Sequence, residues 1–493
     1  MNGLSALWSI FGPVLALLAR IMMAFSFAFL VPLTWGWALD LDYLRAIWGV
    51  AFGLTFGSGL LLMWLTRKQY RELLPRDGFL LVALVWLVLT AYAAIPLYWL
   101  VPDISWSHAY FEAMSGLTAT GATALSGLGD LPVSVNVWRA FLQYIGGLGI
   151  MLLVVAVLPL LGLGGMQLYK AETPGPMKDT KFTPRIAETA RGLWMVYFGF
   201  SLACLLAYRW AGMSWSDAFI HMCSTMSLAG FSSQDASIGY WDSAAVELVA
   251  IVFMALAGIS FLRYFLVLRT LTLGPIAHDR EIRSYFVVLI GSVALVTLLL
   301  TAHQVETDFW TALRSSAFHV LSLATTTGYA ATDYAQWPVF IGVYLMFLGC
   351  FVSCAGSTGG GIKMVRMVLL VKQARRELVR IVHPRVVNPV TLGGQRIAAA
   401  TLTTVLGFML IYGAATLGLT FLLLLTGLDI VTAFSAVVAT LNNIGPGLGQ
   451  VGPAHNFGWL SSFQLWLLSF AMLLGRLELL TVLVLFSRHY WRR

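Results

Sequence analysis

Long apolar runs separated by short polar stretches dominate this chain. A bilayer core of about 30 Å requires about 20 apolar residues per helix, and many of the runs reach that length. The pattern predicts ten membrane-spanning helices, at roughly 8–33, 44–66, 79–101, 136–162, 192–212, 245–271, 285–304, 338–370, 397–426 and 459–487. We therefore expect an all-α polytopic membrane protein.

Composition supports the membrane assignment. Of the 493 residues, 59% are hydrophobic and 11% are charged, whereas soluble domains carry about 25% charged residues. The first span is too long for a signal-peptide core, and no small-residue cleavage site follows it, so we expect it to stay uncleaved. Arg20 lies within this span and is expected to face protein, because a charge facing lipid is costly.

Positive charge is confined to particular segments. Lys and Arg gather at 67–76, 170–191, 269–283, 363–396 and the C-terminal end, and are absent from 101–138, 210–262, 315–362 and 397–475. The positive-inside rule places the basic segments in the cytoplasm, and ten spans then place both termini there. The net charge of +8 is explained by this topology and predicts no nucleic-acid partner. Acidic outer loops would raise the local cation concentration.

A semi-apolar stretch recurs four times between one span and the next. The copies align on Gly121, Gly230, Gly328 and Gly445. Each copy has a helical pattern of about 12 residues, which is ~18 Å and roughly half a bilayer. A helix that ends within the membrane must line protein or water, because lipid would leave its backbone groups unsatisfied. Each unit therefore reads span, re-entrant half-helix, loop, span.

The repeat predicts the domain organisation. We expect four parallel span–half-helix–span pore units around one pseudo-four-fold axis, preceded by two N-terminal spans. The predicted boundaries are 1–70 for the N-terminal helices and 71–170, 171–275, 276–385 and 386–493 for the four pore units.

The residues before each Gly suggest a cation path. A cation that crosses the bilayer must exchange water for other oxygens, and rings of backbone carbonyls can supply them. The C-terminal end of a half-helix is partially negative, which also favours a cation. The side chains of Leu228 and Ile444 cannot coordinate an ion, so we expect main-chain carbonyls as ligands, above all those of the first two residues in each segment. The predicted segments are Thr118, Ala119, Thr120, Gly121; Ser227, Leu228, Ala229, Gly230; Thr325, Thr326, Thr327, Gly328; and Asn442, Asn443, Ile444, Gly445.

The chain resembles the Trk-type bacterial potassium uptake family, the membrane subunits TrkH and TrkG. The resemblance rests on "SGLTATGAT" (115–123) and on 146–190, 229–241, 323–338, 354–370 and 439–453. It implies potassium as the substrate, a homodimer in the inner membrane with one pore per protomer, and a cytosolic nucleotide-binding TrkA-like regulatory partner. No cofactor is expected on this chain. Each segment holds a single Gly, unlike the Thr-x-Gly-Tyr-Gly filter of tetrameric channels, so selectivity for potassium over sodium follows from the resemblance alone.

A second motif, "CAGSTGGGIK" (354–363), interrupts the span predicted at 338–370. Three consecutive Gly residues disfavour a helix by about 1 kcal/mol each relative to Ala. We expect a mobile loop below the filter that acts as a gate, a role the resemblance also implies. A phosphate-binding loop is disfavoured because the Walker Lys-Ser/Thr pair is missing. The predicted gate residues are Gly356, Ser357, Thr358, Gly359, Gly360, Gly361 and Arg476.

Several side chains keep two interpretations. Arg476 could repel cations or hold the gate through backbone carbonyls, or it could pair with Glu478. Glu112 could hydrogen-bond the filter scaffold or attract the ion. His108, His221 and His319 share no metal-ligand spacing, so packing or hydrogen bonding is expected of them. The basic segment 363–396 could dock the partner or bind anionic lipid.

Other classes of protein fit the sequence less well. A membrane-embedded enzyme would need a motif such as HExxH or GxSxG, or paired intramembrane carboxylates, and none is present. We therefore predict no catalytic residues. An alternating-access carrier commonly shows inverted repeats, whereas these four are parallel. A sodium/potassium-unselective pore or a cation-coupled symporter of the same architecture remains the alternative.

Overall fold

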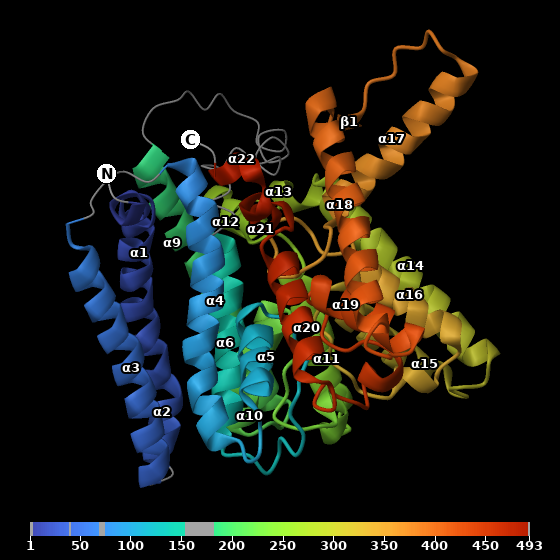
Figure 1. Ribbon diagram of the computed structural model, residues 1–493. Helices are drawn as coiled ribbons and strands as arrows, with labels where there is room; N and C mark the ends of the chain where they lie inside the picture. The colour runs from blue at the N-terminus through green and yellow to red at the C-terminus, as the bar shows by residue number, and fades with distance from the viewer. Residues whose placement is uncertain (1–2, 39–40, 69–73, 153–181, 492–493) are drawn as a thin grey trace.

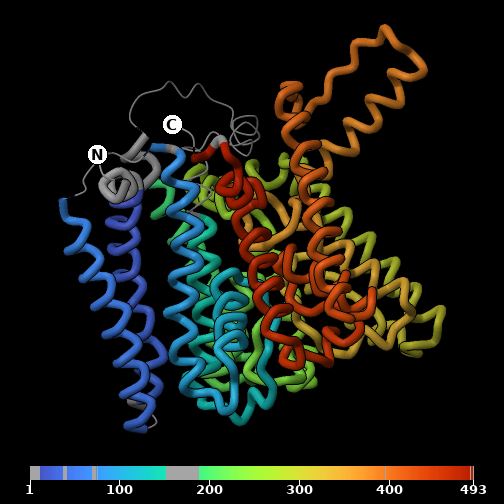
Figure 2. The backbone as a smooth tube through the Cα atoms, viewed as in Figure 1, coloured from blue at the N-terminus to red at the C-terminus, as the bar shows by residue number. Residues whose placement is uncertain are grey.

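The computed structural model describes residues 3–38, 41–68, 74–152 and 182–491 (Figures 1 and 2). Helices make up most of this part of the chain. One short antiparallel ladder joins β1 (Thr391–Leu392) to β2 (Gln395–Arg396). The predicted boundaries near 70 and 170 and the second half of the predicted span 136–162 lie outside the described residues.

The N-terminal helices stand at one side of the molecule (Figure 1). They are α1 (Gly3–Ser26), η1 (Phe27–Phe29), α2 (Leu30–Ala38) and α3 (Asp42–Thr66). Helix α1 packs against α3 and α4 (Pro75–Leu100), and its buried positions include Leu18 and Met22. Arg20 is exposed, so the prediction that it faces protein is wrong. The packed faces of α1 are filled by apolar side chains, and a long Arg side chain can carry its charge along an apolar surface.

The rest of the described chain follows the predicted repeat of span, short helix and span. The first unit is α4, α5 (Trp106–Leu117) and α6 (Val133–Leu152). The second is α9 (Phe182–Trp210), α10 (Trp215–Ser227), η3 (Ser237–Trp241), α11 (Ala244–Ala257), α12 (Phe261–Thr270) and α13 (Gly274–Ala277). The third is α14 (Arg280–Ala302), α15 (Phe309–Ala324), η4 (Tyr334–Gln336), α16 (Val339–Gly349) and α17 (Met364–Val382). The fourth is α18 (Ala399–Leu424), α19 (Ile430–Leu441), η5 (Gly449–Val451), α20 (Ser462–Arg476), α21 (Leu480–Leu483), η6 (Val484–Phe486) and α22 (Arg488–Trp491).

Within the described residues, six helices are long and apolar enough to cross a membrane, or eight if each bent pair counts as one span. The prediction of ten full spans is therefore wrong in detail. The predicted span 245–271 bends by 81° between α11 and α12, and 459–487 bends by 109° after α20. The span predicted at 338–370 contains only 11 helical residues in α16 before a non-helical segment. Apolar composition reports burial in lipid or protein alike, so it does not reveal these breaks.

The half-helices α5, α10, α15 and α19 connect the units. Each packs against both neighbouring spans of its own unit and against the last span helix of the unit before it. Thus α10 packs on α6, α15 on α11, α19 on α16, and α5 on α20, which closes the series into a cycle. The four half-helices have 12, 13, 16 and 12 residues, in agreement with the half-bilayer length expected from the sequence.

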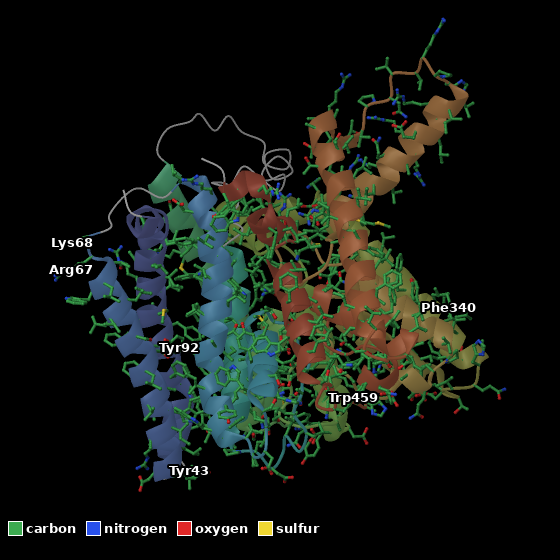
Figure 3. All side chains as sticks on the ribbon, in the orientation of Figure 1. Tyr43, Arg67, Lys68, Tyr92, Phe340 and Trp459 are labelled. Atoms are coloured by element: carbon green, nitrogen blue, oxygen red, sulfur yellow. The ribbon has the colours of Figure 1, made fainter. Side chains whose placement is uncertain are left out.

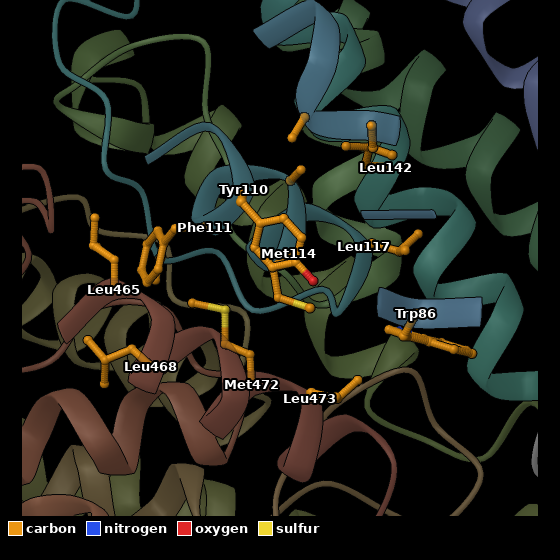
Figure 4. Packing of buried hydrophobic residues seen from close by; sticks show 14 of the residues in the cluster. Trp86, Tyr110, Phe111, Met114, Leu117, Leu142, Leu465, Leu468, Met472 and Leu473 are labelled. Atoms are coloured by element: carbon orange, nitrogen blue, oxygen red, sulfur yellow. The ribbon is translucent and has the colours of Figure 1, made fainter. Parts of the chain in front are cut away.

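Apolar side chains hold each half-helix in place. Figure 4 shows Phe111 and Met114 of α5 among Leu465, Leu468 and Met472 of α20. Lipid-facing character appears on the outer faces of the described helices, where large apolar side chains are exposed. Phe340 and Trp459, labelled in Figure 3, are 58% and 47% exposed. This pattern is the one expected when lipid, rather than water, is the surrounding solvent.

Candidate functional site

The four predicted segments (118–121, 227–230, 325–328 and 442–445, hereafter the Gly segments) have the same backbone. The second residue of each lies in the left-handed region, with φ of 52° at Ala119, 54° at Leu228, 64° at Thr326 and 54° at Asn443. The closing Gly residues also have positive φ, between 72° and 104°. Non-Gly residues in this region are strained and persist only where their surroundings hold them.

Each Gly segment also ends its half-helix in the same way. The N–H of the third residue donates to the carbonyl five residues earlier, as Thr120 does to Ser115 (2.8 Å) and Ile444 to Ala439 (2.8 Å). The equivalent bonds of Ala229 and Thr327 are 3.0 and 2.8 Å. This 6→1 pattern is that of a Schellman motif, which turns the chain sharply away from the helix axis.

The polar residue three positions before each Gly caps the half-helix. Thr118, Ser227 and Thr325 donate their hydroxyls to the carbonyl four residues earlier, at 2.6, 2.8 and 2.7 Å. Asn442 makes the same contact through Nδ2, at 2.8 Å to Val438 O. These side chains therefore satisfy carbonyls that a helix terminus leaves unpaired. Their side chains point back into the scaffold, which leaves the main chain as the source of ligands in the Gly segments.

The four Gly residues touch one another's segments in a closed cycle. A Cβ added at Gly121 would lie 2.0 Å from Ala229 O, one at Gly230 2.0 Å from Thr327 O, and one at Gly328 2.0 Å from Ile444 O. A Cβ at Gly445 would lie 3.0 Å from Thr120 O. In every case the facing oxygen belongs to the residue before the next unit's Gly, so the four segments form one ring. No side chain larger than hydrogen fits at the first three positions.

The chain after Gly121 is held by a buried ion pair. Glu112 Oε2 accepts from Ala124 N at 2.8 Å, and Thr123 donates to Oε1 at 2.9 Å. Arg139 pairs with the same carboxylate at 2.7 Å, and both side chains are at most 1% exposed. Glu112 thus has the scaffold contacts that the sequence left as one of two interpretations. Arg139 was missed by the sequence analysis, although it stands as a charge inside the predicted span 136–162.

The other units carry equivalent braces. His221 Nε2 is hydrogen-bonded to Ser232 Oγ (3.1 Å), and His319 Nε2 accepts from Ala331 N (3.3 Å). Both His residues lie nine positions before their Gly, as Glu112 does. In the fourth unit Ser435 Oγ accepts from Leu448 N at 2.9 Å. The hydrogen-bonding role expected of these His residues therefore has a specific purpose, which is to hold the chain that leaves each Gly segment.

The outer ends of the half-helices are capped as well. Ser105, Ser214, Asp308 and Asp429 each accept a hydrogen bond from the backbone of the first turn. The bonds from Thr311 hold the pKa of Asp308 below its ordinary value, and those from Thr432 do the same for Asp429. These two carboxylates therefore stay ionised at neutral pH and place negative charge at helix N-termini, where it is favourable.

The 350–363 loop, between α16 and α17, lies against the Gly segments of three units. Its Gly360 N donates to Thr326 Oγ1 (2.8 Å), and Thr358 Oγ1 donates to Met226 O (2.9 Å). A Cβ at Gly360 would lie 2.0 Å from Asn442 O. The Gly residues of this loop therefore permit a close approach of its backbone to the base of the ring.

Arg476 completes the contact between the loop and the first and fourth units. Its Nη1 donates to Thr358 O (2.9 Å) and its Nη2 to Gly146 O (3.0 Å), and the side chain is 3% exposed. Glu478 pairs with Arg366 at 2.6 Å, so the alternative pair of Arg476 with Glu478 does not form. Of the two remaining interpretations, the observed contacts match the one in which Arg476 holds the loop by its carbonyls.

Glu281, at the start of α14, holds both ends of this region. Its Oε1 accepts from Ala355 N (2.8 Å) and from Val365 N (3.1 Å). Lys363 donates from Nζ to Gly359 O within the loop. Neither residue was singled out from sequence, because the partners lie 74 and 84 residues away from Glu281.

An apolar helical bundle built around four re-entrant helices, with backbone oxygens gathered at their inner ends, defines a membrane transport protein. Residues 49–493 match the family model TrkH, described as cation transport protein. The chain belongs to the TrkH family.

The relatives and solved structures agree with this assignment. The chain is 41% identical to the Trk system potassium uptake protein TrkH of Vibrio parahaemolyticus over 98% of this chain and 99% of the relative. It is 43% identical to the TrkH protein of Escherichia coli K12 over 90% and 92%. The crystal structure of the potassium transporter TrkH from Vibrio parahaemolyticus matches with a TM-score of 0.89 and 37% identity, covering 98% of this chain and all of that chain.

Proposed function

We propose that this chain takes up potassium through a gated pore whose filter is the ring of four Gly segments around a pseudo-four-fold axis. The observation that carries the proposal is the closed cycle in which each Gly faces the carbonyl before the next Gly. Carbonyl rings can replace the hydration shell of a cation without binding it too tightly to leave. The names of the relatives, all potassium uptake proteins or transporters, support potassium as the ion.

The 350–363 loop is the gate in this proposal. It lies against the base of the ring and is held there by Arg476, Glu281 and the hydroxyl of Thr326. A buried guanidinium near the base of a cation filter would also repel the ion electrostatically. Opening then requires the loop and Arg476 to separate, which breaks hydrogen bonds but exposes little apolar surface.

The remaining parts of the proposal concern location and partners. The start of α1 lies at the same end of the molecule as α12, α17 and α22 (Figure 1), and these helices carry Arg and Lys side chains. The positive-inside rule makes this end cytoplasmic in a bacterial inner membrane. The basic segment 363–396, which projects from this end, is the proposed docking site of a TrkA-like nucleotide-binding subunit, and we propose a homodimer.

Two measurements test the proposed function. In a bacterium that lacks potassium uptake, the chain expressed with its partner should restore growth at low potassium and carry rubidium influx. In planar bilayers, the purified protein should give reversal potentials that follow the potassium gradient. Failure of both growth and rubidium influx, in cells that contain the protein in their membrane, would overturn the proposal.

A sodium/potassium-unselective pore or a cation-coupled symporter is the second candidate. It is favoured by the unequal Gly segments, since Leu228 and Ile444 stand where other units carry Thr or Asn neighbours. Reversal potentials under a potassium/sodium gradient and under a pH gradient separate these candidates. A reversal potential that follows the pH gradient would indicate proton coupling, whereas one that ignores the exchange of sodium for potassium would indicate an unselective pore.

A further inference from the structure

The second Gly segment lacks an internal contact that the first and third possess. In those two, the hydroxyl of the residue before Gly binds the hydroxyl at the segment's start, at 2.7 Å between Thr118 and Thr120 and 2.8 Å between Thr325 and Thr327. These bonds tie the last peptide of the segment to the end of its half-helix. In the second segment the corresponding residue is Ala229, which has no hydroxyl.

Gln143 of α6 supplies a brace at this place. Its Nε2 donates to Ala229 O at 2.7 Å, and its Oε1 accepts from Phe231 N at 3.3 Å. The side chain is fully buried. One amide group therefore holds the peptides on both sides of Gly230. In the part of the chain that the structure describes, no other carbonyl at this level of the ring is recorded with a side-chain donor.

The position of this contact makes it more than a packing detail. Ala229 O is the oxygen that faces Gly121 of the first unit, so Gln143 acts at the junction of two Gly segments. Ala229 is flanked by two residues with positive φ, Leu228 (54°) and Gly230 (72°). A peptide between two such residues can rotate with little resistance from its own side chains, since Ala offers no hydrogen bond to oppose it.

We propose that Gln143 is a positioning residue of the filter, which replaces the missing Thr hydroxyl of the second unit and sets the discrimination between potassium and sodium. The proposal rests on the proposed function, because it assigns a role within the same ring. Without the amide, the Ala229 carbonyl is free to turn, and the ring loses the uniform oxygen geometry that favours one ion size. Ion flow itself persists, since the other three segments keep their own contacts.

The test replaces the amide while keeping its volume. Gln143→Met removes both hydrogen bonds, and Gln143→Asn keeps an amide that is one methylene too short to reach both partners. Tyr144→Phe is the matched control, because it removes a buried hydrogen bond of the next residue, to Ser201 Oγ at 2.9 Å, away from the ring. Each purified protein is examined in bilayers for the potassium-to-sodium permeability ratio and in detergent for its thermal unfolding.

In both Gln143 variants the permeability ratio should fall about fivefold, the factor that corresponds to one ordinary hydrogen bond. Tyr144→Phe should keep the ratio of the unaltered protein. If the unaltered protein discriminates between the ions and the folded Gln143 variants keep that ratio within about twofold, the inference is overturned. If the unaltered protein itself passes no potassium, the proposed function fails instead. Should Gln143→Met not fold, Gln143→Asn decides the matter.

Discussion

Arg476 donates a hydrogen bond of 2.9 Å to the carbonyl oxygen of Thr358. The two residues are 118 positions apart in the chain, and the contact joins the end of α20 to the middle of the 350–363 loop. The described contacts of Arg476 are to main-chain oxygens, and its Nε has no partner among the described residues. A buried charge with this set of contacts holds the loop in one place.

Replacing Arg476 should weaken the gate. Arg476→Ala removes two charge-assisted hydrogen bonds, each worth about 1.5–3 kcal/mol, and also removes the positive charge below the filter. We expect rubidium flux in the absence of the cytosolic partner to rise on the order of tenfold, with each 1.4 kcal/mol worth one factor of ten. Flux in proteoliposomes measures this directly, with Arg45→Ala as a control because Arg45 makes an exposed pair with Asp42. Equal partner-free flux in Arg476→Ala and the unaltered protein would contradict the gating role.

Substitutions of the ring Gly residues should differ in severity. Gly121→Ser and Gly328→Ser place a Cβ 2.0 Å from a carbonyl oxygen, whereas Gly445→Ser leaves 3.0 Å. The first two should therefore lower the potassium-to-sodium permeability ratio more than the third, although all three are strained by positive φ. Gly291→Ser on α14 is the control, since a Cβ there meets nothing within 4 Å. A permeability ratio that stays unchanged in Gly121→Ser would argue against the filter assignment.

Breaking the buried Glu112–Arg139 pair should destabilise the protein strongly. Glu112→Ala leaves the guanidinium of Arg139 buried without its carboxylate and leaves Ala124 N unpaired, so a loss of about 3–5 kcal/mol in the free energy of unfolding is expected. Asp42→Ala removes an exposed partner, 94% accessible, and should cost no more than about 1 kcal/mol. Thermal unfolding of both variants in detergent gives the comparison. Similar unfolding temperatures for the two would show that the buried pair is not needed for stability.

Removing the Glu281 carboxylate should free the ends of the gate. Glu281→Leu deprives Ala355 N and Val365 N of their shared acceptor, and each unpaired buried N–H costs about 1–3 kcal/mol. The loop is then expected to leave its place below the ring, which raises partner-free rubidium flux. Glu377→Leu on the exposed part of α17 serves as the control, because its carboxylate contacts only neighbouring charged or polar side chains of the same helix. Flux equal to that of the control would show that Glu281 does not anchor the loop.

The apolar pattern predicted most helices because burying apolar side chains in lipid or protein requires the same residues in either case. For the same reason it could not locate the bend after Arg476 or the bend between α11 and α12, where the sequence stays apolar across the break. The exposed position of Arg20 was also beyond the pattern, since a long side chain tolerates more than one environment. Gln143 and Glu281 gave no signal, because their partners are backbone atoms, which any residue type can present.

The sequence alone determined that four half-helices end in a polar residue and a Gly, because those requirements are local. A helix terminus leaves its own carbonyls to be capped, and a left-handed turn favours Gly within the same few residues. Only the tertiary structure decided that Gly121 faces Ala229 and that Gly445 faces Thr120. Those contacts join residues that are 108 and 325 positions apart, and they depend on how each half-helix packs against the preceding unit. Side-chain volumes summed over whole helices set that packing, so no short motif contains it.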